Sequence, residues 1–431
     1  MSSPNEEKLT LTEAFKDNVL YRRSSIFYIL IFFVPVGYIL HFLSPNATLV
    51  FITNFLAIIP SARLFKFASN QLSHHRSNEI LEGLLDVALN NFVELVITII
   101  ALAYGQIRVV QAAVLGSILF HILLILGLCF LIGGIKILNA KKKKLEQDFS
   151  SSSTAVQADS SVLTLACISL ILPASFSLFV NQNDPNANDD AIYRISYGTS
   201  IVLLITCVFY LYFKSKSHKE LFNIETSKEK NKYLNLPYSL ILLIVMAVII
   251  VFSAILLVGS INGVVESNKI SKTFIGVILL PIVGHIAKYI NIFYIGSEDN
   301  KDNKEKTTES EEKMENEEKT TEMMECEKMM AAKTVNSIRS SIQTAIFITP
   351  LLVILGWIIN KHMSLSFLPF ETICLFIAVM FRNYLLNVRF LFKFFYFFTD
   401  SKTNWLEGVM LISTYLIMGL AFFFYPDPPE L

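Results

Sequence analysis

Charged residues and cysteine are scarce in this chain, and both absences exclude classes of protein. Only 17% of the 431 residues are charged, and 36 basic residues balance 36 acidic ones, so no nucleic acid partner is expected. The five cysteines are scattered without a metal-ligand spacing or a disulfide framework, so buried free thiols are expected. No phosphate-binding glycine loop, nucleophile elbow or zinc motif occurs, and therefore neither an enzyme activity nor a bound cofactor is expected.

Long apolar runs are abundant instead. Apolar residues make up 53% of the sequence and come in blocks of roughly 20, the length of a helix that spans a bilayer. The sequence therefore predicts an all-α integral membrane protein surrounded by the lipid bilayer. Eleven blocks can be read, at residues 25–43, 48–68, 80–104, 107–137, 161–182, 190–213, 235–260, 272–296, 334–359, 366–388 and 404–425. The long fourth block is expected to be tilted or broken at Gly116 or Gly127, and Pro281 and Gly284 suggest a broken helix in the eighth.

Lysines gather in alternate loops, which predicts the orientation of the chain. The loop at residues 214–234 carries many lysines, whereas the connection at residues 181–190 has acidic residues and no basic one. By the positive-inside rule, the N-terminal segment 1–24 lies in the cytosol and the tail 426–431 lies in the lumen or outside the cell. Because segment 1–24 is polar and mixed in charge, no cleavable signal peptide is expected, and the leading helix 25–43 serves as the insertion signal.

One loop differs from the others in composition. Residues 297–332 hold 13 acidic residues and 6 lysines, and repeat Lys-Thr-Thr-Glu twice. Such a segment has too little apolar surface to fold alone, so a disordered or frayed helical cytosolic insert is expected. A solvated linker is the simplest interpretation, and a regulatory or cation-attracting role is left open.

The third block carries a polar stripe at membrane depth. Asp86, Asn90 and Glu94 follow one another at i, i+4 and i+8, so they line one face of a helix. An ionisable side chain at the centre of a bilayer costs roughly 2.5–3.5 kcal/mol on insertion scales. Two carboxylates on one stripe therefore need a polar cavity, a cation or a partner. The stripe predicts an ion site, and the alternative is that neighbouring helices satisfy both carboxylates.

After the leading helix the chain divides into two related halves of five spans, residues 48–213 and 235–425. The motif Asn91-x-x-Glu94 of the third block corresponds to His285-x-x-Lys288 of the eighth. Because five is an odd number, the two halves must lie in the membrane with opposite orientations. Inverted repeats of this kind build secondary transporters, whose ion site lies at the midplane between the repeats.

Longer motifs occur in both halves. They are Gly83-Leu84-Leu85, Gly105-Gln106-Ile107-Arg108-Val109-Val110-Gln111-Ala112 and Gly116-Ser117-Ile118-Leu119, then Pro281-Ile282-Val283-Gly284, Ser340-Ser341-Ile342-Gln343, Thr349-Pro350-Leu351-Leu352-Val353 and Asn404-Trp405-Leu406-Glu407-Gly408. With them the chain resembles the vacuolar calcium/proton exchangers of the calcium/cation antiporter superfamily. The resemblance implies an eleven-helix antiporter of the vacuolar membrane that moves calcium or a related cation out of the cytosol in exchange for protons. It also implies that one glutamate from each half faces the other at the midplane, where calcium finds the hard oxygen ligands it prefers.

The second half departs from the pattern of this family. His285 stands where the family has asparagine, Lys288 where it has glutamate, and Arg339 where it has glycine. A charged lysine has no lone pair to offer a cation. Since an unpaired buried charge is strongly unfavourable, we expect Lys288 to pair with Glu94 across the repeat interface, and Arg339 to reach Asp86.

Three functions follow from these substitutions. In the first, the protein still exchanges a cation for protons with altered or reduced activity, through a site rebuilt from Asp86, Asn91, Glu94 and His285. In the second, it keeps the exchanger fold without transport and acts as a scaffold or a regulator. In the third, Lys288 itself gives up and takes up a proton during exchange of a monovalent cation, which requires that burial favour its neutral form.

The expected transport site combines residues of both halves. They are Glu94, Asn91, Asp86, Ser117, Gln111, His285, Lys288, Ser340, Ser341 and Gln343. Glu94 is the expected metal ligand, and the transported cation and protons are the expected substrates. Gln111 and Gln343 could equally be hydrogen-bonding groups between helices, and His121 is expected to be a hydrogen-bonded bundle histidine rather than a proton relay. A homo-oligomer is compatible with the sequence.

Overall fold

The computed structural model describes residues 30–43, 46–73, 79–139, 153–181, 189–218, 236–297, 330–395 and 405–427. These residues are almost all helical, with no β-strand among them. The N-terminal segment 1–24, most of the loop 214–234 and of the insert 297–332, and the end of the tail 426–431 lie outside the described residues. The properties expected of those segments stay predictions.

The helices follow the predicted blocks closely. The first half contains α3 (Phe33–Leu43), α4 (Ala47–Ser73), α5 (Glu79–Asn90), α6 (Phe92–Ala103), α7 (Ile107–Leu119), α8 (Leu126–Asn139), α9 (Ser153–Asn181) and α10 (Asp189–Tyr212). The second half contains α12 (Leu236–Asn268), α13 (Lys272–Phe274), α14 (Leu280–Ser297), a helix over residues 330–343, α16 (Thr349–Ile358), α17 (Pro369–Phe395) and α18 (Trp405–Phe424). Short π-helical turns are η2 (Phe120–Ile125), η3 (Phe213–Ser217), η4 (Ile275–Leu279) and η6 (Thr344–Ile348).

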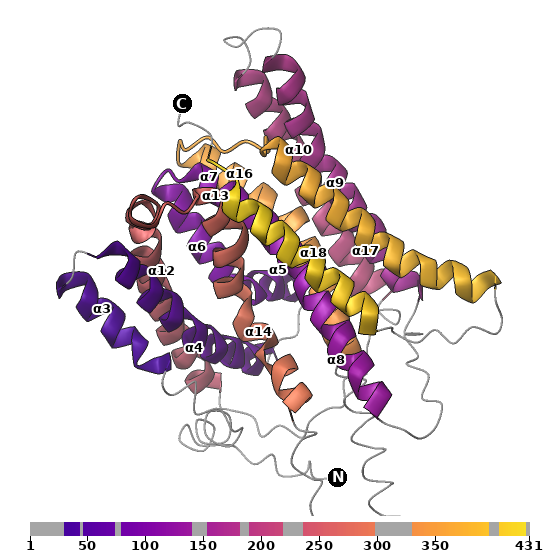
Figure 1. The fold of residues 1–431 in the computed structure, drawn as a ribbon, viewed down its shortest axis with the longest axis horizontal. Helices are drawn as coiled ribbons and strands as arrows, with labels where there is room; N and C mark the ends of the chain where they lie inside the picture. Colours follow the sequence, from indigo (N-terminus) through magenta and orange to yellow (C-terminus); the bar gives the residue numbers. More distant parts are fainter. Residues whose placement is uncertain are drawn as a thin grey trace, which may run out of the picture.

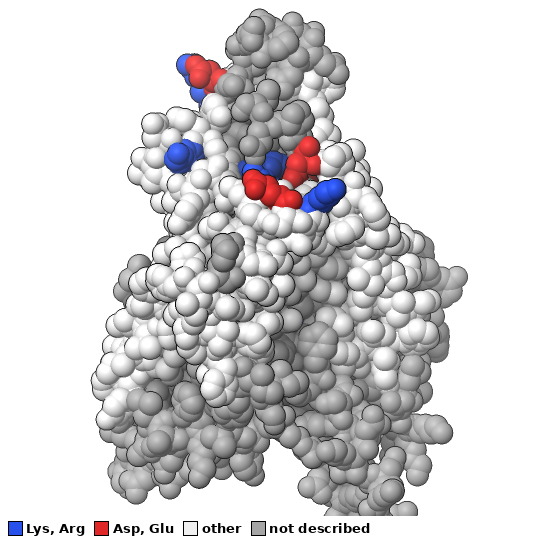
Figure 2. Space-filling view, turned by 60° about the vertical axis from the view of Figure 1, so that its left-hand side comes forward, with Lys and Arg blue, Asp and Glu red and all other residues white. Residues whose placement is uncertain are grey.

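Nine helical segments of the described chain are long and apolar enough to cross a membrane, and the bent pair α5–α6 makes ten. The described part of the first predicted block contains α3, an apolar helix of 11 residues, and the start of that block lies outside the described residues. On the face shown in Figure 2, the visible charged side chains lie towards one end of the molecule, and the described surface below them shows none. Four cysteines, Cys129, Cys167, Cys207 and Cys374, are buried free thiols as predicted, whereas Cys326 lies outside the described residues.

The helix breaks lie in other places than the sequence predicts. The third span bends by 70° between α5 and α6, at Asn91. The eighth runs unbroken over Lys272–Tyr289, so the predicted break at Pro281 is wrong. Pro281 comes just after η4, a π-helical turn that is wound more widely than an α-helix and so leaves room for the proline ring. The fourth span is also continuous, with η2 between its two glycines, so the alternative of a break there is wrong as well.

Helices of the two halves alternate across the bundle. Figure 1 shows α4 and α12 together on one flank with α3 outside them, while α8 packs along α18 and α10 against α16. The two halves approach closely where α7 crosses η4. A Cβ at Gly116 would lie 2.2 Å from the carbonyl oxygen of Val277, and a Cβ at Gly276 would lie 2.5 Å from the Cβ of Ala112. Small residues thus bring the two halves into backbone contact.

A buried ion pair joins α7 to α17 near the start of both helices. Arg108 Nη2 donates to Glu371 Oε1, and Glu371 Oε2 accepts the backbone N–H of Leu368 at 3.2 Å. The side chain of Glu371 is 0% exposed, whereas that of Arg108 is 20% exposed. The pair therefore holds the connection between α16 and α17 against the start of α7.

Breaking this pair should destabilise the fold. We expect Glu371→Gln to lower the free energy of unfolding by about 2 kcal/mol, less than for a fully buried pair because Arg108 still reaches water. Thermal unfolding of the purified protein in detergent measures the change. Glu266→Gln, the same substitution at an exposed position near the end of α12, is the matched control and should unfold like the wild type. Equal unfolding temperatures for both variants would contradict the proposed contribution of the pair.

Candidate ion site

The bend at Asn91 places two polar side chains of the third span inside the bundle. Asn91 is 1% exposed and Glu94 is 4% exposed. The backbone of Asn91, with φ −111° and ψ 19°, lies outside the helical range and separates α5 from α6. Its side-chain amide donates to the carbonyl oxygen of Val87 at 3.0 Å and to Oε1 of Gln343 at 3.2 Å. Glu94 lies in the first turn of α6, where the helix dipole favours a negative charge.

The second half of the chain supplies two contacts of the Glu94 carboxylate. His285 Nε2 lies 3.3 Å from Glu94 Oε2, and Thr344 Oγ1 donates to the same oxygen at 3.3 Å. A Cβ at Gly284 would lie 3.7 Å from the Cβ of Glu94, so α14 approaches α6 closely at this point. The carboxylate predicted to bind the ion therefore lies where the two halves meet.

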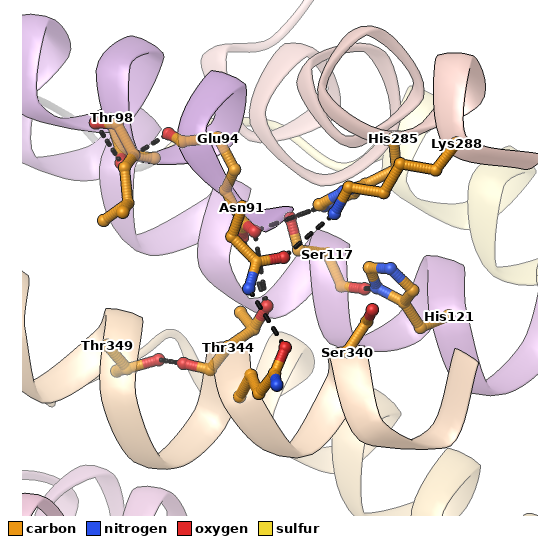
Figure 3. Close-up of polar contacts among 12 residues, drawn as sticks. Asn91, Glu94, Thr98, Ser117, His121, His285, Lys288, Ser340, Thr344 and Thr349 are labelled. Atoms are coloured by element: carbon orange, nitrogen blue, oxygen red, sulfur yellow. Dashed lines mark hydrogen bonds and ion pairs between the residues drawn. The ribbon is translucent and has the colours of Figure 1, made fainter. Parts of the chain in front are cut away.

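Lys288 points into the same interface (Figure 3). Its Nζ donates to Asn91 Oδ1 at 2.9 Å and lies 3.1 Å from His285 Nδ1. Because an ammonium group only donates, Nδ1 must accept, and the proton of the neutral ring is then on Nε2, facing Glu94. The charges of Lys288 and Glu94 act on each other across the repeat interface, as predicted, but the described residues show no direct ion pair between them: His285 contacts both. His285 and Lys288 are one turn apart on α14, and the ring reaches the carboxylate first.

A second imidazole packs against the site. The ring centroid of His121, in η2, lies 4.3 Å from that of His285, and its Nδ1 lies 2.7 Å from the carbonyl oxygen of Ser117. Ser337 Oγ donates to the backbone carbonyl oxygen of His121 at 2.7 Å. The Ser337 hydroxyl therefore forms a hydrogen bond with the backbone of the π-helical turn. The hydrogen-bonded bundle histidine predicted from the sequence is confirmed, and its ring extends the polar cluster.

The two glutamines and Ser117 have different places. Ser117 Oγ lies 3.2 Å from His285 Nε2, and Gln343 accepts from Asn91, so both belong to the site. Gln111 instead donates to the carbonyl oxygen of Ser364 at 2.9 Å, in the connection before α17. It is therefore a hydrogen-bonding group between elements, the alternative that the sequence left open.

Four other predicted residues have contacts with groups other than the Glu94 carboxylate. Ser340 accepts from the hydroxyl of Tyr289 at 3.4 Å, and Ser341 donates at 2.6 Å to a carbonyl oxygen of its own helix. Asp86 and Arg339 are half-buried and both have polar or electrostatic contacts. The pairing of Arg339 with Asp86 stays a prediction.

Thr344 is the contact of Glu94 that the sequence reasoning missed. It directly follows Gln343 and shares one helical face with Ser337 and Ser341, at i, i+4 and i+7. A stripe of small hydroxyl residues through an apolar block is typical of a helix that packs closely against a polar partner. Reading that stripe to its end would have found Thr344.

The site offers mostly oxygen atoms. The carboxylate of Glu94, the amide oxygens of Asn91 and Gln343, and the hydroxyls of Ser117 and Thr344 are hard ligands of the kind that calcium prefers. In the described part of the chain, no group of three or more His, Cys, Asp or Glu side chains could hold a metal ion. A cation that takes Asn91 Oδ1 as a ligand must displace the ammonium group of Lys288.

Known proteins are similar to this chain over most of its length. A family model described as sodium/calcium exchanger protein matches residues 46–216. A vacuolar calcium ion transporter of Schizosaccharomyces pombe is 34% identical over 407 residues, which cover 94% of this chain and 86% of that protein. A Ca²⁺/H⁺ antiporter of Aphanothece halophytica is 30% identical over 427 residues, covering 96% of this chain and 100% of that one. The chain belongs to the calcium/cation antiporter family.

A solved structure supports the same assignment. The selenium-substituted Ca²⁺/H⁺ antiporter protein YfkE is similar with a TM-score of 0.67 at 26% identity, covering 93% of this chain and 99% of that one. The resemblance inferred from the sequence motifs is thereby confirmed. Membership of the calcium/cation antiporter family, together with the apolar helices, makes this chain an integral membrane protein of helical class.

Proposed function

We propose that this family member is a cation/proton antiporter of the calcium/proton exchanger type, with activity altered or reduced by Lys288. It moves calcium or a related cation out of the cytosol into an acidic compartment, and the Glu94 carboxylate takes the cation and the proton in turn. The relatives named as a vacuolar calcium ion transporter and a Ca²⁺/H⁺ antiporter support this substrate class. The vacuolar membrane is the proposed location, by analogy with the first of them.

The observation that carries the proposal is the position of Lys288 beside a buried carboxylate. Glu94 is 4% exposed, and oxygen atoms that could ligate a cation lie around it. Such a place suits a carboxylate that alternates between a cation and a proton. The Nζ of Lys288, 2.9 Å from Asn91 Oδ1, adds a positive charge next to that carboxylate. Two like unit charges 4 Å apart repel by about 4 kcal/mol at an effective dielectric constant of 20. An ammonium at this place therefore opposes the entry of a divalent cation.

The proposed architecture is a leading helix followed by two inverted five-helix repeats, eleven spans in all. Reciprocal packing supports it, because two of the contacts between the halves have a counterpart with the halves exchanged. Helix α14 packs on α4 as α12 packs on α6, and α18 packs on α8 as α16 packs on α10. The lysine-rich loops support an orientation with the N-terminus in the cytosol and the C-terminus in the lumen.

A non-transporting exchanger fold with a scaffold or regulatory role is the second candidate. The two hydrogen bonds of Lys288, to Asn91 and His285, favour it because they hold the ammonium group in place. In this case Lys288 permanently takes the place of the cation. The two candidates differ in whether any cation crosses the membrane.

Uptake into vesicles tests the proposal. The purified protein is reconstituted into vesicles with an acidic interior, and uptake of labelled calcium and of sodium is followed against empty vesicles. We expect low but measurable uptake by the wild type, and none by Glu94→Gln, because an amide can neither neutralise a cation nor exchange a proton. Glu266→Gln should match the wild type. Uptake that survives Glu94→Gln would contradict the proposed role of Glu94, and wild-type uptake equal to that of empty vesicles would favour the second candidate.

A further inference from the structure

Three lysines of different helices converge at the end of the bundle next to the ion site. Lys66 belongs to α4, Lys288 to α14, and Lys333 to the helix over residues 330–343; together they are called the lysine cluster. All three side chains are half-buried, so water still reaches them. The charge of Lys66 acts on both of the others, and Lys333 Nζ lies 3.4 Å from the carbonyl oxygen of Lys288. The fold thus brings three ammonium groups from both halves together.

Their hydrogen bonds in the described chain all go to neutral groups. Lys66 Nζ donates to Asn90 Oδ1, and Lys333 Nζ donates to a backbone carbonyl oxygen. The partners of Lys288 are the Asn91 amide oxygen and the His285 ring. An ammonium group carries three donors, so Lys66 and Lys333 each use only part of their capacity. The lysine cluster therefore has N–H groups left over for a further acceptor.

Within the described part of the chain, two carboxylates act on the cluster. Asp86 acts electrostatically on Lys66, and Glu94 acts on Lys288. Three lysine side chains thus face two carboxylates among the residues that the structure describes. Glu94 is in addition engaged with His285 and Thr344. Half-buried cations with spare donors and a positive excess attract an anion.

We propose that the lysine cluster binds a phosphate group, either as inorganic phosphate or as the headgroup phosphate of a lipid. A phosphate monoester or inorganic phosphate carries close to two negative charges near neutral pH, which matches the positive excess better than a single-charge anion. Its oxygens point in different directions and can accept from ammonium groups on three helices at once. Lysine is also a common phosphate-binding residue, since it acts as a point charge without requiring a planar partner. The cluster and its ligand do not depend on whether a cation is transported.

Binding of labelled inorganic phosphate to the full-length protein tests the proposal. The protein is placed in nanodiscs of phosphatidylcholine at low salt, and phosphate binding is measured by equilibrium dialysis without any ion gradient. We expect saturable binding that is weakened by roughly tenfold or more in Lys66→Gln and in Lys333→Gln, because each loses a charge-assisted hydrogen bond. Lys361→Gln, at an exposed lysine in the connection after α16, is the matched control and should bind like the wild type.

A second arm separates the two sources of phosphate. In nanodiscs that contain phosphatidic acid, a lipid occupant displaces labelled phosphate, and native mass spectrometry should show the lipid retained by the wild type and lost in Lys66→Gln. Lys66→Arg, which keeps the charge, should retain binding and guards against a folding defect. The proposal is overturned if neither phosphate nor phosphatidic acid binds saturably, or if both Gln variants bind like the wild type. Because no transport is measured, failure here leaves the antiporter proposal standing, and the reverse is also true.

Discussion

Lys288→Glu is expected to raise proton-driven calcium uptake by roughly tenfold or more over the wild type. The substitution removes the ammonium group that bonds Asn91 Oδ1 and places a second carboxylate opposite Glu94. Two carboxylates with amide and hydroxyl oxygens around them form a harder and more negative site, which suits calcium. Uptake of labelled calcium into vesicles with an acidic interior measures the effect.

Three variants show whether the gain comes from the site. Lys288→Met, which removes the charge without adding a ligand, should give a smaller gain than Lys288→Glu. Adding Glu94→Gln to Lys288→Glu should abolish the gain, because one carboxylate is lost again. Lys361→Glu makes the same change at an exposed position and should leave uptake unaltered. High wild-type uptake that falls in Lys288→Glu would contradict the idea that Lys288 opposes the cation.

Gly116→Ala is expected to be the most destabilising single-methyl change in the bundle. The new Cβ would lie 2.2 Å from the carbonyl oxygen and 2.5 Å from the Cα of Val277. Both are backbone atoms of η4, so no side chain can turn away, and α7 must separate from the eighth span. Overpacking of a core costs 1–3 kcal/mol in typical cases, and we expect about 3 kcal/mol here. Thermal unfolding and the fraction of monodisperse protein measure the loss.

Gly259→Ala is the matched control for this change. A Cβ at Gly259, in α12, meets nothing within 4 Å, so the methyl group only adds helix propensity. We expect this variant to be as stable as the wild type or slightly more stable. An unfolding temperature for Gly116→Ala equal to that for Gly259→Ala would mean that the crossing of α7 and η4 is not tightly packed. The same substitution at Gly276 should resemble Gly116→Ala, because it faces Ala112 across the same crossing.

The site residues show which properties of the site could be predicted from the sequence. The spacing of Asn91 and Glu94, and of His285 and Lys288, predicted that both pairs belong to corresponding helices, and the structure brings all four together. The sequence did not show which of them touch. Whether Lys288 or His285 reaches Glu94 first depends on the distance and rotation between α14 and α6, to which Gly284 contributes by allowing their close approach.

Helix irregularities were the least predictable feature. Proline and glycine suggested breaks in the fourth and eighth spans, yet both run through with a π-helical turn. The actual bend lies at Asn91, a residue that disfavours a helix interior only mildly compared with proline. Such a bend persists because its side chain bonds Gln343 and Lys288, which are distant in sequence. Local propensity cannot contain information of that kind.

By itself, the sequence determined that this is a helical membrane protein, where its spans lie, and which family it belongs to. Those properties depend on apolar blocks and on contiguous motifs, which can be read directly from the order of residues. The blocks are visible because the bilayer requires about 20 apolar residues for every helix that crosses it. Only the tertiary structure decided that His285 mediates between Lys288 and Glu94, that Thr344 joins the site, and that lysines of three helices gather beside it. These features depend on contacts between residues up to 250 positions apart in the chain, and only the packing of helices against one another determines them.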